Sequence, residues 1–219
     1  MNKKKSASIV EPRKEPKQER SRQTYQVILQ GAAKIIRKFG VQKFSTNKVA
    51  EESGVSIGSL YQYFPSKEAV IAALIDQTFE YEYERLKLRL DAISPKIGAR
   101  EVIKQIFAHY YKIDSEDLNY RKVMVEAVSL VDKTTEALNF HRIMAELILS
   151  FMKRHYKAVQ GKIDYETTLF IVQYMLRATA LSSVDENIEK INVDHMMEEL
   201  AETLMNFIKV PAEYRDPMP

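Results

Sequence analysis

The stretch from residue 45 to residue 67, STNKVAEESGVSIGSLYQYFPSK, constrains the fold more than any other. Hydroxyl residues begin it, apolar residues then recur at helical spacing, and Gly54 ends that run, which predicts a short helix. Gly54 suits a tight turn, Val55 plugs that turn from the inside, and Ser56 can cap a second helix. Two short helices joined by a turn that contains Gly are typical of a helix-turn-helix, whose second helix lies in the DNA major groove.

The predicted second helix, residues 57–64, has two different faces. Leu60 and Phe64 lie four residues apart and therefore share one buried face. The opposite face is small or hydrogen-bonding where a solvated helix usually carries Lys and Glu. It consists of Ile57, Gly58, Ser59, Gln62 and Tyr63. Such a face suits a groove.

The stretch GVSIGSLYQYFPSKEAV resembles the second half of the DNA-binding domain of the TetR (tetracycline repressor) family. That family's pattern runs helix, Gly-Val-Ser, x-Gly-Thr/Ser-Leu-Tyr, x-Tyr-Phe, x-x-Lys. The upstream stretch VILQGAAKIIRKFGVQKFSTNKVAEESG is similar to the family's first two helices in order and spacing. The resemblance covers residues 20 to about 75. It implies an N-terminal helix-turn-helix domain, a C-terminal helical domain for ligand binding and dimerisation, and a homodimer.

The resemblance and the side-chain chemistry together give candidate DNA contacts. Lys67 is expected at a helix N-terminus, which already favours an anion, so a Lys there is explained by a DNA phosphate, the contact made by the family's matching Lys. Gln62 can pair with adenine, and Ile57 can meet a thymine methyl group. Tyr61 either contacts a phosphate or packs in the small core, and Gly58 either allows close approach to DNA or merely tolerates a turn. The predicted DNA-binding residues are Arg22, Thr24, Thr46, Asn47, Ser56, Ile57, Gly58, Ser59, Tyr61, Gln62, Tyr63 and Lys67.

Charge is distributed unevenly along the 219 residues, whose net charge is +3. Residues 1–67 carry 14 basic and 5 acidic side chains, whereas residues 68–219 carry 19 and 25. This fits a nucleic-acid-binding head on a body that avoids the polyanion, although uneven solvation would give the same pattern. Residues 1–22 are basic and almost without apolar content, which predicts a disordered arm. The arm either lies along DNA or only aids solubility.

The remaining chain shows helical patterns and no alternating strand pattern, so we predict an all-α protein of about nine helices. The expected helices are 24–39, 46–53, 57–64, 66–90, 101–113, 118–131, 135–159, 165–184 and 193–208. We expect four parts in chain order: the basic arm 1–22, the helix-turn-helix domain 23–68, a helical effector-binding and dimerisation domain 69–210, and a C-terminal tail 211–219.

The sequence lacks the residue patterns of an enzyme or a metal site. It has no Cys, and its four His residues are scattered without a pair at metal-binding spacing. No Gly-rich phosphate loop and no Gly-x-Ser-x-Gly elbow occurs. We therefore expect no catalysis, no metal and no cofactor. The sequence also shows neither a secretory signal nor an apolar run of 18 residues, which predicts a soluble, cytoplasmic protein.

Tyr, Phe and Met are frequent in the second half of the chain. Such residues either form the core or line an adaptable apolar pocket between helices. Glu126 and Arg177 interrupt apolar stretches and either pair internally or face such a pocket. The candidate ligand-binding residues are Phe107, Tyr110, Met124, Glu126, Phe140, Met144, Phe170, Tyr174 and Arg177.

The last two predicted helices carry more apolar surface than one small bundle needs. The resemblance implies that this pair forms a two-fold dimer interface, and such a dimer also suits pseudo-palindromic DNA. The alternative is that both helices are wholly internal. The candidate interface residues are Leu169, Val172, Gln173, Leu176, Ala180, Met197, Leu200, Ala201, Leu204 and Ile208.

Two functional hypotheses follow. The first is a homodimeric, sequence-specific transcriptional regulator, a repressor that a small, largely apolar ligand releases from a palindromic operator. The alternative is a constitutive or architectural DNA-binding protein without an effector. A helical enzyme or a partner-binding module ranks third because no catalytic residue set is present.

Overall fold

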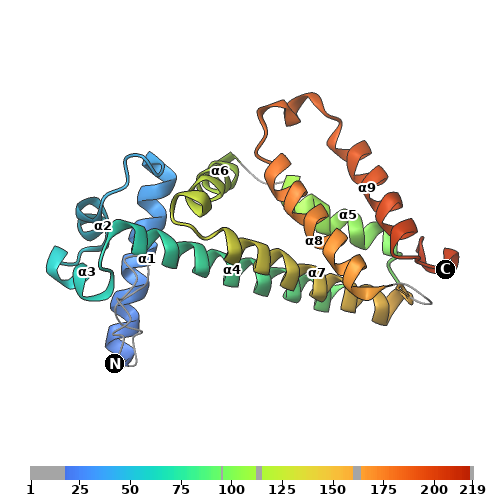
Figure 1. Cartoon of the computed structure of the whole chain (residues 1–219), viewed down its shortest axis with the longest axis horizontal. Coiled ribbons are helices and arrows are strands. Elements are labelled where there is room, and N and C mark those ends of the chain that lie inside the picture. The colour runs from blue at the N-terminus through green and yellow to red at the C-terminus, as the bar shows by residue number, and fades with distance from the viewer. Residues whose placement is uncertain (1–17, 95, 112–114, 160–163, 218–219) are drawn as a thin grey trace, which may run out of the picture. The chain divides into compact units, whose positions relative to one another are not determined.

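The computed structural model describes residues 18–94, 96–111, 115–159 and 164–217, and these residues form nine α-helices, two short 3-10 helices and no strand (Figure 1). The all-α prediction is therefore confirmed. The α-helices are α1 (Glu19–Phe39), α2 (Thr46–Ser53), α3 (Ile57–Tyr63), α4 (Lys67–Ala92), α5 (Ala99–Tyr111), α6 (Ser115–Leu130), α7 (Thr134–Tyr156), α8 (Tyr165–Ser182) and α9 (Val193–Phe207). The short helices are η1 (Glu186–Lys190) and η2 (Ala212–Tyr214).

Helix α1 begins earlier than the apolar pattern predicts. Residues 19–22, which we expected to belong to a disordered arm, form its first turn. The amide of Arg22 donates to the carbonyl of Gln18, and the Thr24 hydroxyl donates to the carbonyl of Arg20. Glu, Arg and Gln are good helix formers without being apolar, so a search for an apolar stripe misses this turn. The rest of the expected arm, residues 1–17, lies outside the described residues.

The described residues group into two compact units. The first contains α1 to α3, α4 up to Glu80, and residues 115–134, which include α6. The second contains the rest of α4 with α5, α7, α8 and α9. The functional division at residue 68 stays a prediction. By packing, however, α6 belongs with the helix-turn-helix and not with the helices that precede and follow it.

The core of the first unit lies between α1, α3, α4 and α6. Ile28 and Ile36 of α1 are wholly buried, as are Leu60 of α3 and Phe64 directly after it. Helix α6 contributes Ala127, also wholly buried, to the same cluster. Figure 1 shows α1, α2 and α3 grouped around the start of α4. Helices α2 and α3 therefore rest on one continuous apolar core.

Polar contacts tie α6 to two other helices of the first unit. The Tyr120 hydroxyl lies 3.0 Å from the Thr78 hydroxyl of α4. The guanidinium of Arg37, from α1, lies 4.2 Å from the centre of the Tyr120 ring. After α6, the Lys133 ammonium pairs with the Asp76 carboxylate of α4 at 3.0 Å. Helix α6 is thus fixed to both α1 and α4.

The second unit has a separate core. Phe107 of α5, Tyr156 of α7, Leu169 of α8 and Ala201 of α9 all belong to it, and each is at most 1% exposed. Helix α5 packs along α9. Every helix of this unit contributes buried apolar side chains to this core.

The described residues contain neither a membrane-spanning helix nor a metal-binding cluster. No described helix has the length and apolar character to span a membrane. No group of three or more His, Asp or Glu side chains in the described part lies close enough together to hold a metal ion.

A close contact between small residues sets the crossing of α1 and α2. A Cβ atom placed on Gly31 of α1 would lie 2.1 Å from the Ser53 hydroxyl oxygen of α2. That oxygen is buried and has no hydrogen-bond partner within the described residues. The two helices therefore approach closely because residue 31 has no side chain.

We expect Gly31→Ala to lower the free energy of unfolding by about 1 to 3 kcal/mol through overpacking, although Ala is the better helix former. Adding Ser53→Ala removes the clashing oxygen and should restore most of the loss. Ser53→Ala alone should be neutral or stabilising, because it removes a buried hydroxyl without a partner. Urea unfolding of the four proteins measures this cycle. A Gly31→Ala protein as stable as the wild type, or one that Ser53→Ala does not rescue, would contradict the described contact.

Candidate nucleic-acid interface

The turn between α2 and α3 depends on Gly54. Its φ of 66° and ψ of 24° lie in the left-handed region, which Gly adopts at no steric cost. The Gly54 amide donates to the carbonyl of Glu51, and the Val55 amide donates to the carbonyl of Ala50. At the other end of α2, the Ser45 hydroxyl accepts from the amide of Lys48 at 3.4 Å. Both ends of α2 are therefore closed by the residues that the sequence pattern predicts.

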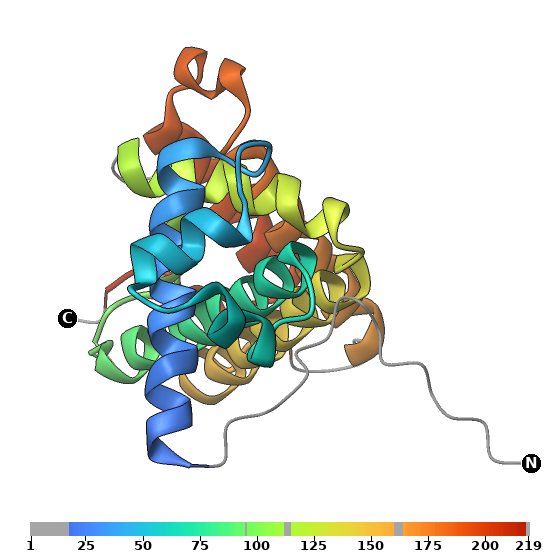
Figure 2. The same cartoon turned by 90° about the vertical axis from the view of Figure 1, so that its left-hand side faces the viewer.

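Helix α3 is only seven residues long and depends on its surroundings. The Ser56 hydroxyl accepts from the amide of Ser59 at 3.0 Å and caps the helix. Leu60 and Phe64 are wholly buried, and the Phe64 ring lies 5.0 Å from that of Tyr25 in α1. Figure 2 looks onto the side of the first unit that carries α2 and α3. Since so short a helix is unstable alone, packing of its inner face holds it in place.

The outer face of α3 and the start of α2 are open to solvent. Ile57 is 39% exposed, and Gly58 and Gln62 are also exposed. Asn47, in the first turn of α2, is exposed as well. Neither α2 nor α3 has an acidic residue in its first turn, so the positive ends of both helix dipoles are left uncompensated by carboxylates. These four residues offer hydrogen-bonding and apolar groups without negative charge.

Several other predicted contacts are occupied within the protein. The Ser56 and Ser59 hydroxyls lie 2.8 Å apart, so the two hydroxyls are bonded to each other at the cap. Thr46 is 9% exposed, and its hydroxyl lies 3.1 Å from that of Tyr61. The Tyr61 ring is 41% exposed. Of the two possibilities for Tyr61, the ring is therefore not buried in the core, while its hydroxyl is bonded to α2.

The remaining predicted contacts lie at the edges of this surface. Tyr63 is half-buried, and its ring meets that of Tyr25 edge-on at 6.2 Å. Arg22 is exposed on α1, whereas the Thr24 hydroxyl is used within that helix. Lys67 is the first residue of α4, its side chain is 49% exposed, and its ammonium lies 3.9 Å from the carboxylate of Glu68.

One basic side chain beside this surface was missed by the sequence analysis. The Lys48 ammonium donates to the carbonyl of Lys43 at 3.1 Å and lies 4.8 Å from the centre of the Phe39 ring. Lys48 directly follows the exposed Asn47. The charge count included Lys48, but its position depends on how the end of α1 packs beside α2, and no local pattern gives that.

The predicted ligand-binding residues are divided between the two units. Met124 packs in the core of the first unit, and exposed Glu126 accepts a hydrogen bond from Gln42 in that same unit. These two were expected in the effector domain because α6 was assigned to it. In the second unit, Phe107 and Met144 are buried and Phe140 and Arg177 are half-buried, whereas Phe170 and Tyr174 are exposed. The side chain of Tyr110 lies outside what is described.

Seven of the ten predicted dimer-interface residues are buried inside the second unit, so their side chains face the wrong way for a partner. These are Leu169, Val172, Leu176, Met197, Ala201, Leu204 and Ile208. Gln173, Ala180 and Leu200 are half-buried. The outward face of α8 instead carries Phe170, Tyr174 and Leu181, which are 55%, 41% and 45% exposed. Helix α8 is apolar nearly all round, and so its sequence does not reveal which side faces the core.

The N-terminal part of the chain matches a known family. Residues 28–74 match the sequence pattern of the family described as "Bacterial regulatory proteins, tetR family". Residues 28–74 therefore resemble the DNA-binding domain of the TetR family. The match runs from α1 through α2 and α3 into α4, and so it contains the whole helix-turn-helix.

Two known proteins match part of the chain. It is 26% identical over 98 residues to the Fatty acid metabolism regulator protein of Bacillus subtilis (strain 168), covering 45% of this chain and 49% of that protein. It is 34% identical over 71 residues to the A-factor receptor protein of Streptomyces griseus, covering 31% of this chain and 26% of that protein. The chain thus spans half or less of the length of these relatives.

A solved structure extends the likeness to most of the fold. Salmonella enterica GusR superposes with a TM-score of 0.62, covering 85% of this chain and 96% of that chain at 19% identity. At this identity the match shows a shared fold. The second unit therefore has the helical arrangement found in GusR as well.

We expect Gln62→Ala to reduce the preference for the cognate sequence at one base pair, by the roughly 1 to 3 kcal/mol that a bidentate side-chain contact contributes to discrimination. Gln105→Ala is the matched control, because Gln105 is a surface residue of α5 in the second unit. Binding to operator duplexes mutated at each position measures the effect. Equal losses on operator and random DNA would remove Gln62 from the base-reading residues.

Lys67→Ala should instead weaken binding to all duplexes alike, because a phosphate contact carries no sequence information. The slope of log K against log salt should become shallower by about 0.9, the value for one lost phosphate contact. Lys87→Ala, an exposed lysine on the part of α4 that belongs to the second unit, is the control and should leave the slope unchanged. An unchanged slope in Lys67→Ala would show that Lys67 does not contact a phosphate.

Proposed function

We propose that this protein is a homodimeric, sequence-specific transcriptional regulator that binds palindromic operator DNA through α3. The outward face of α3 carries the proposal. A helix of this length is not stable alone. It is nevertheless capped and anchored by two wholly buried side chains. Its outward residues Ile57, Gly58 and Gln62 face solvent. A surface that is small, uncharged and able to hydrogen-bond fits the base edges of a major groove.

The distribution of charge along the chain also supports DNA binding by its N-terminal part. The first 67 residues carry 14 basic and 5 acidic side chains, whereas the remainder is net acidic. Phosphate neutralisation by basic residues supplies the sequence-independent part of DNA affinity, whereas an acidic body is repelled. The N-terminal unit is therefore the part expected to approach DNA.

The outward face of α8 is the proposed dimer interface. Phe170 and Tyr174 lie one turn apart with ring centres 4.7 Å from each other, and Leu181 lies two turns further along the same face. A two-fold axis through this face would bury the same stripe from both protomers. Two protomers then present two α3 helices to two half-sites of a palindrome.

A small, largely apolar ligand is the proposed effector, and it would release a repressor from the operator. The relative from Bacillus subtilis is named for fatty acid metabolism, and the second unit of this chain is rich in apolar and aromatic side chains. Release requires that the ligand prefer the conformation with low DNA affinity, since equal affinity for both conformations shifts nothing.

Helix α6 offers a route for such a signal. Its side chains pack in the first unit, but α5 before it and α7 after it belong to the second unit. A rearrangement of α7 would reach α6 through residues 131–133, which join the two helices. The contacts of Tyr120 with Arg37 and Thr78 then carry the change to α1 and α4.

Selection from a randomised duplex pool at two salt concentrations tests the proposal. An enriched inverted repeat with steep salt dependence is the expected result. Release of that duplex is then assayed with palmitate as a probe of the fatty-acyl class. Binding without an enriched motif would favour the architectural alternative, and absence of binding at low salt would refute α3 as a DNA-reading element.

Tyr174→Glu should weaken the dimer at least about tenfold, because it places a charge in a buried apolar contact. The control is Tyr165→Glu, which changes an exposed tyrosine on a different face of the same helix. Sedimentation velocity over a concentration series measures the change. A Tyr174→Glu protein that dimerises like the wild type would place the interface elsewhere.

A further inference from the structure

The C-terminal residues of the described chain run directly against the start of α5. A Cβ atom on Gly98, the residue before α5, would lie 2.4 Å from the carbonyl carbon of Asp216 and 2.6 Å from the carbonyl oxygen of Arg215. Both neighbours are main-chain atoms, which cannot rotate away. Residue 98 is therefore a glycine because residues 211–216, here named the C-terminal strap, occupy the space beside it.

The strap also completes the N-terminus of α5. The amide of Arg100, in the first turn, donates to the carbonyl of Arg215 at 2.9 Å. First-turn amides have no partner within their own helix, and a Ser, Thr, Asp or Asn side chain usually provides one. Gly98 has no such side chain. The main-chain carbonyl of Arg215 accepts this hydrogen bond instead.

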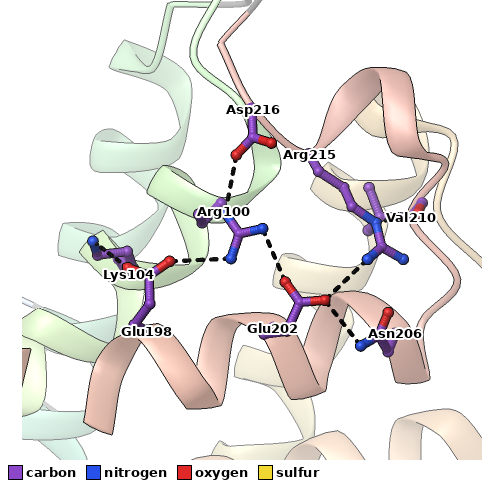
Figure 3. Close-up of polar contacts among 8 residues, drawn as sticks. All are labelled: Arg100, Lys104, Glu198, Glu202, Asn206, Val210, Arg215 and Asp216. Carbon is purple, nitrogen blue, oxygen red and sulfur yellow. Dashed lines mark hydrogen bonds and ion pairs between the residues drawn. The ribbon is translucent and has the colours of Figure 1, made fainter. Parts of the chain in front are cut away.

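Side chains of α5 and of the strap itself also hold the strap in place (Figure 3). The Arg100 guanidinium donates to Asp216 of the strap at 3.0 Å and pairs with Glu198 and Glu202 of α9 at 3.0 and 2.9 Å. From the strap, Arg215 pairs with Glu202 at 3.1 Å. Arg100 is therefore the one residue of α5 in Figure 3 that contacts both the strap and two carboxylates of α9.

Glu198 of α9 pairs with both Lys104 and Arg100 of α5. Hydrogen bonds from Lys104 and then Arg100 hold the pKa of Glu198 below its ordinary value. A carboxylate whose pKa is lower in the folded state contributes stability above its unfolded pKa and loses that contribution as the pH falls through the folded one. The contacts of Glu198 therefore weaken in acid.

The same corner of the fold is held from α7. The hydroxyl of Tyr156, a wholly buried residue, donates to the carbonyl of Ile97 at 2.7 Å. Burial raises the pKa of Tyr156, so its hydroxyl stays a donor. Leu86 and Leu90, in the last part of α4, are buried in the core of this unit. The connection between α4 and α5 is thus held by the strap at Gly98 and by Tyr156 at Ile97.

We propose that the C-terminal strap fixes the end of α4 and that Arg100 is the positioning residue that holds the strap. Helix α4 continues without a break from residue 67, just after the reading helix, to residue 92, just before this corner. A fixed end of α4 limits how far each helix-turn-helix of a dimer can shift. The strap therefore determines how much the distance between operator half-sites can vary before the dimer loses affinity. This inference rests on the proposed function.

Two readouts test this in the full-length protein. The variants are Arg100→Gln, which removes the ion pairs, and Gly98→Ala, which displaces the strap. The control is Arg142→Gln, because Arg142 lies on α7 and also pairs with two carboxylates, Glu146 and Glu166. The first readout is amide hydrogen exchange over residues 86–104. It should become faster in both variants and stay unchanged in the control, because local opening is sensitive to local contacts.

The second readout is affinity for duplexes whose half-sites stand at the selected spacing or one base pair further apart. The ratio of these affinities does not depend on the fraction of folded protein, so lower stability alone leaves it unchanged. Arg100→Gln should reduce the preference for the selected spacing at least about threefold, on the scale of a partly exposed ion-pair network. Gly98→Ala should act in the same direction.

The possible results separate the two proposals. Unchanged exchange in both variants would overturn the strap as a holding element, whether or not DNA binds. Faster exchange with an unchanged spacing ratio would overturn its role in positioning α4 for DNA. Failure of the wild type to select an inverted repeat would refute the proposed function, and the spacing role with it.

Discussion

Burial of Leu60 and Phe64 is the interaction on which the rest of the structure depends. Helix α3 has seven residues, and so short a helix does not form in water without tertiary support. The support is an apolar core to which α1, α4 and α6 contribute. With its inner side fixed in this way, the helix presents its remaining residues outward at a defined angle. A surface that recognises bases must be held rigidly, because a misplaced hydrogen-bond donor no longer distinguishes one base from another.

The helix-turn-helix was predictable because its signals are local. Hydroxyl caps, a glycine at the turn and apolar residues four apart all act within a few positions, and the structure has each of them in the expected role. The later helices were also found from their periodicity, with ends that differ by a few residues. Caps and turns fix helix ends, whereas periodicity only locates the middle.

Two expectations failed because they concerned long-range packing. Helix α6 was placed with its sequence neighbours, but its core residues and Tyr120 pack in the first unit. Helix α8 is apolar on several sides, and the side chosen for the dimer is the one that faces the core. The strap shows the same limit. In the sequence, Gly98 looks like an ordinary loop glycine. Only the structure shows that residues 215 and 216 occupy the space where a side chain would lie.

Methylation interference on the selected duplex tests the central claim most directly, because methylation of guanine N7 blocks the major groove and leaves the minor groove open. If α3 of each protomer reads a major groove, interference should fall in two patches at least about one helical turn apart, on one side of the duplex. Tight binding without interference at any guanine of the half-sites would contradict the account. It would show that the protein holds DNA by its backbone or minor groove, and that the outward face of α3 is not a reading surface.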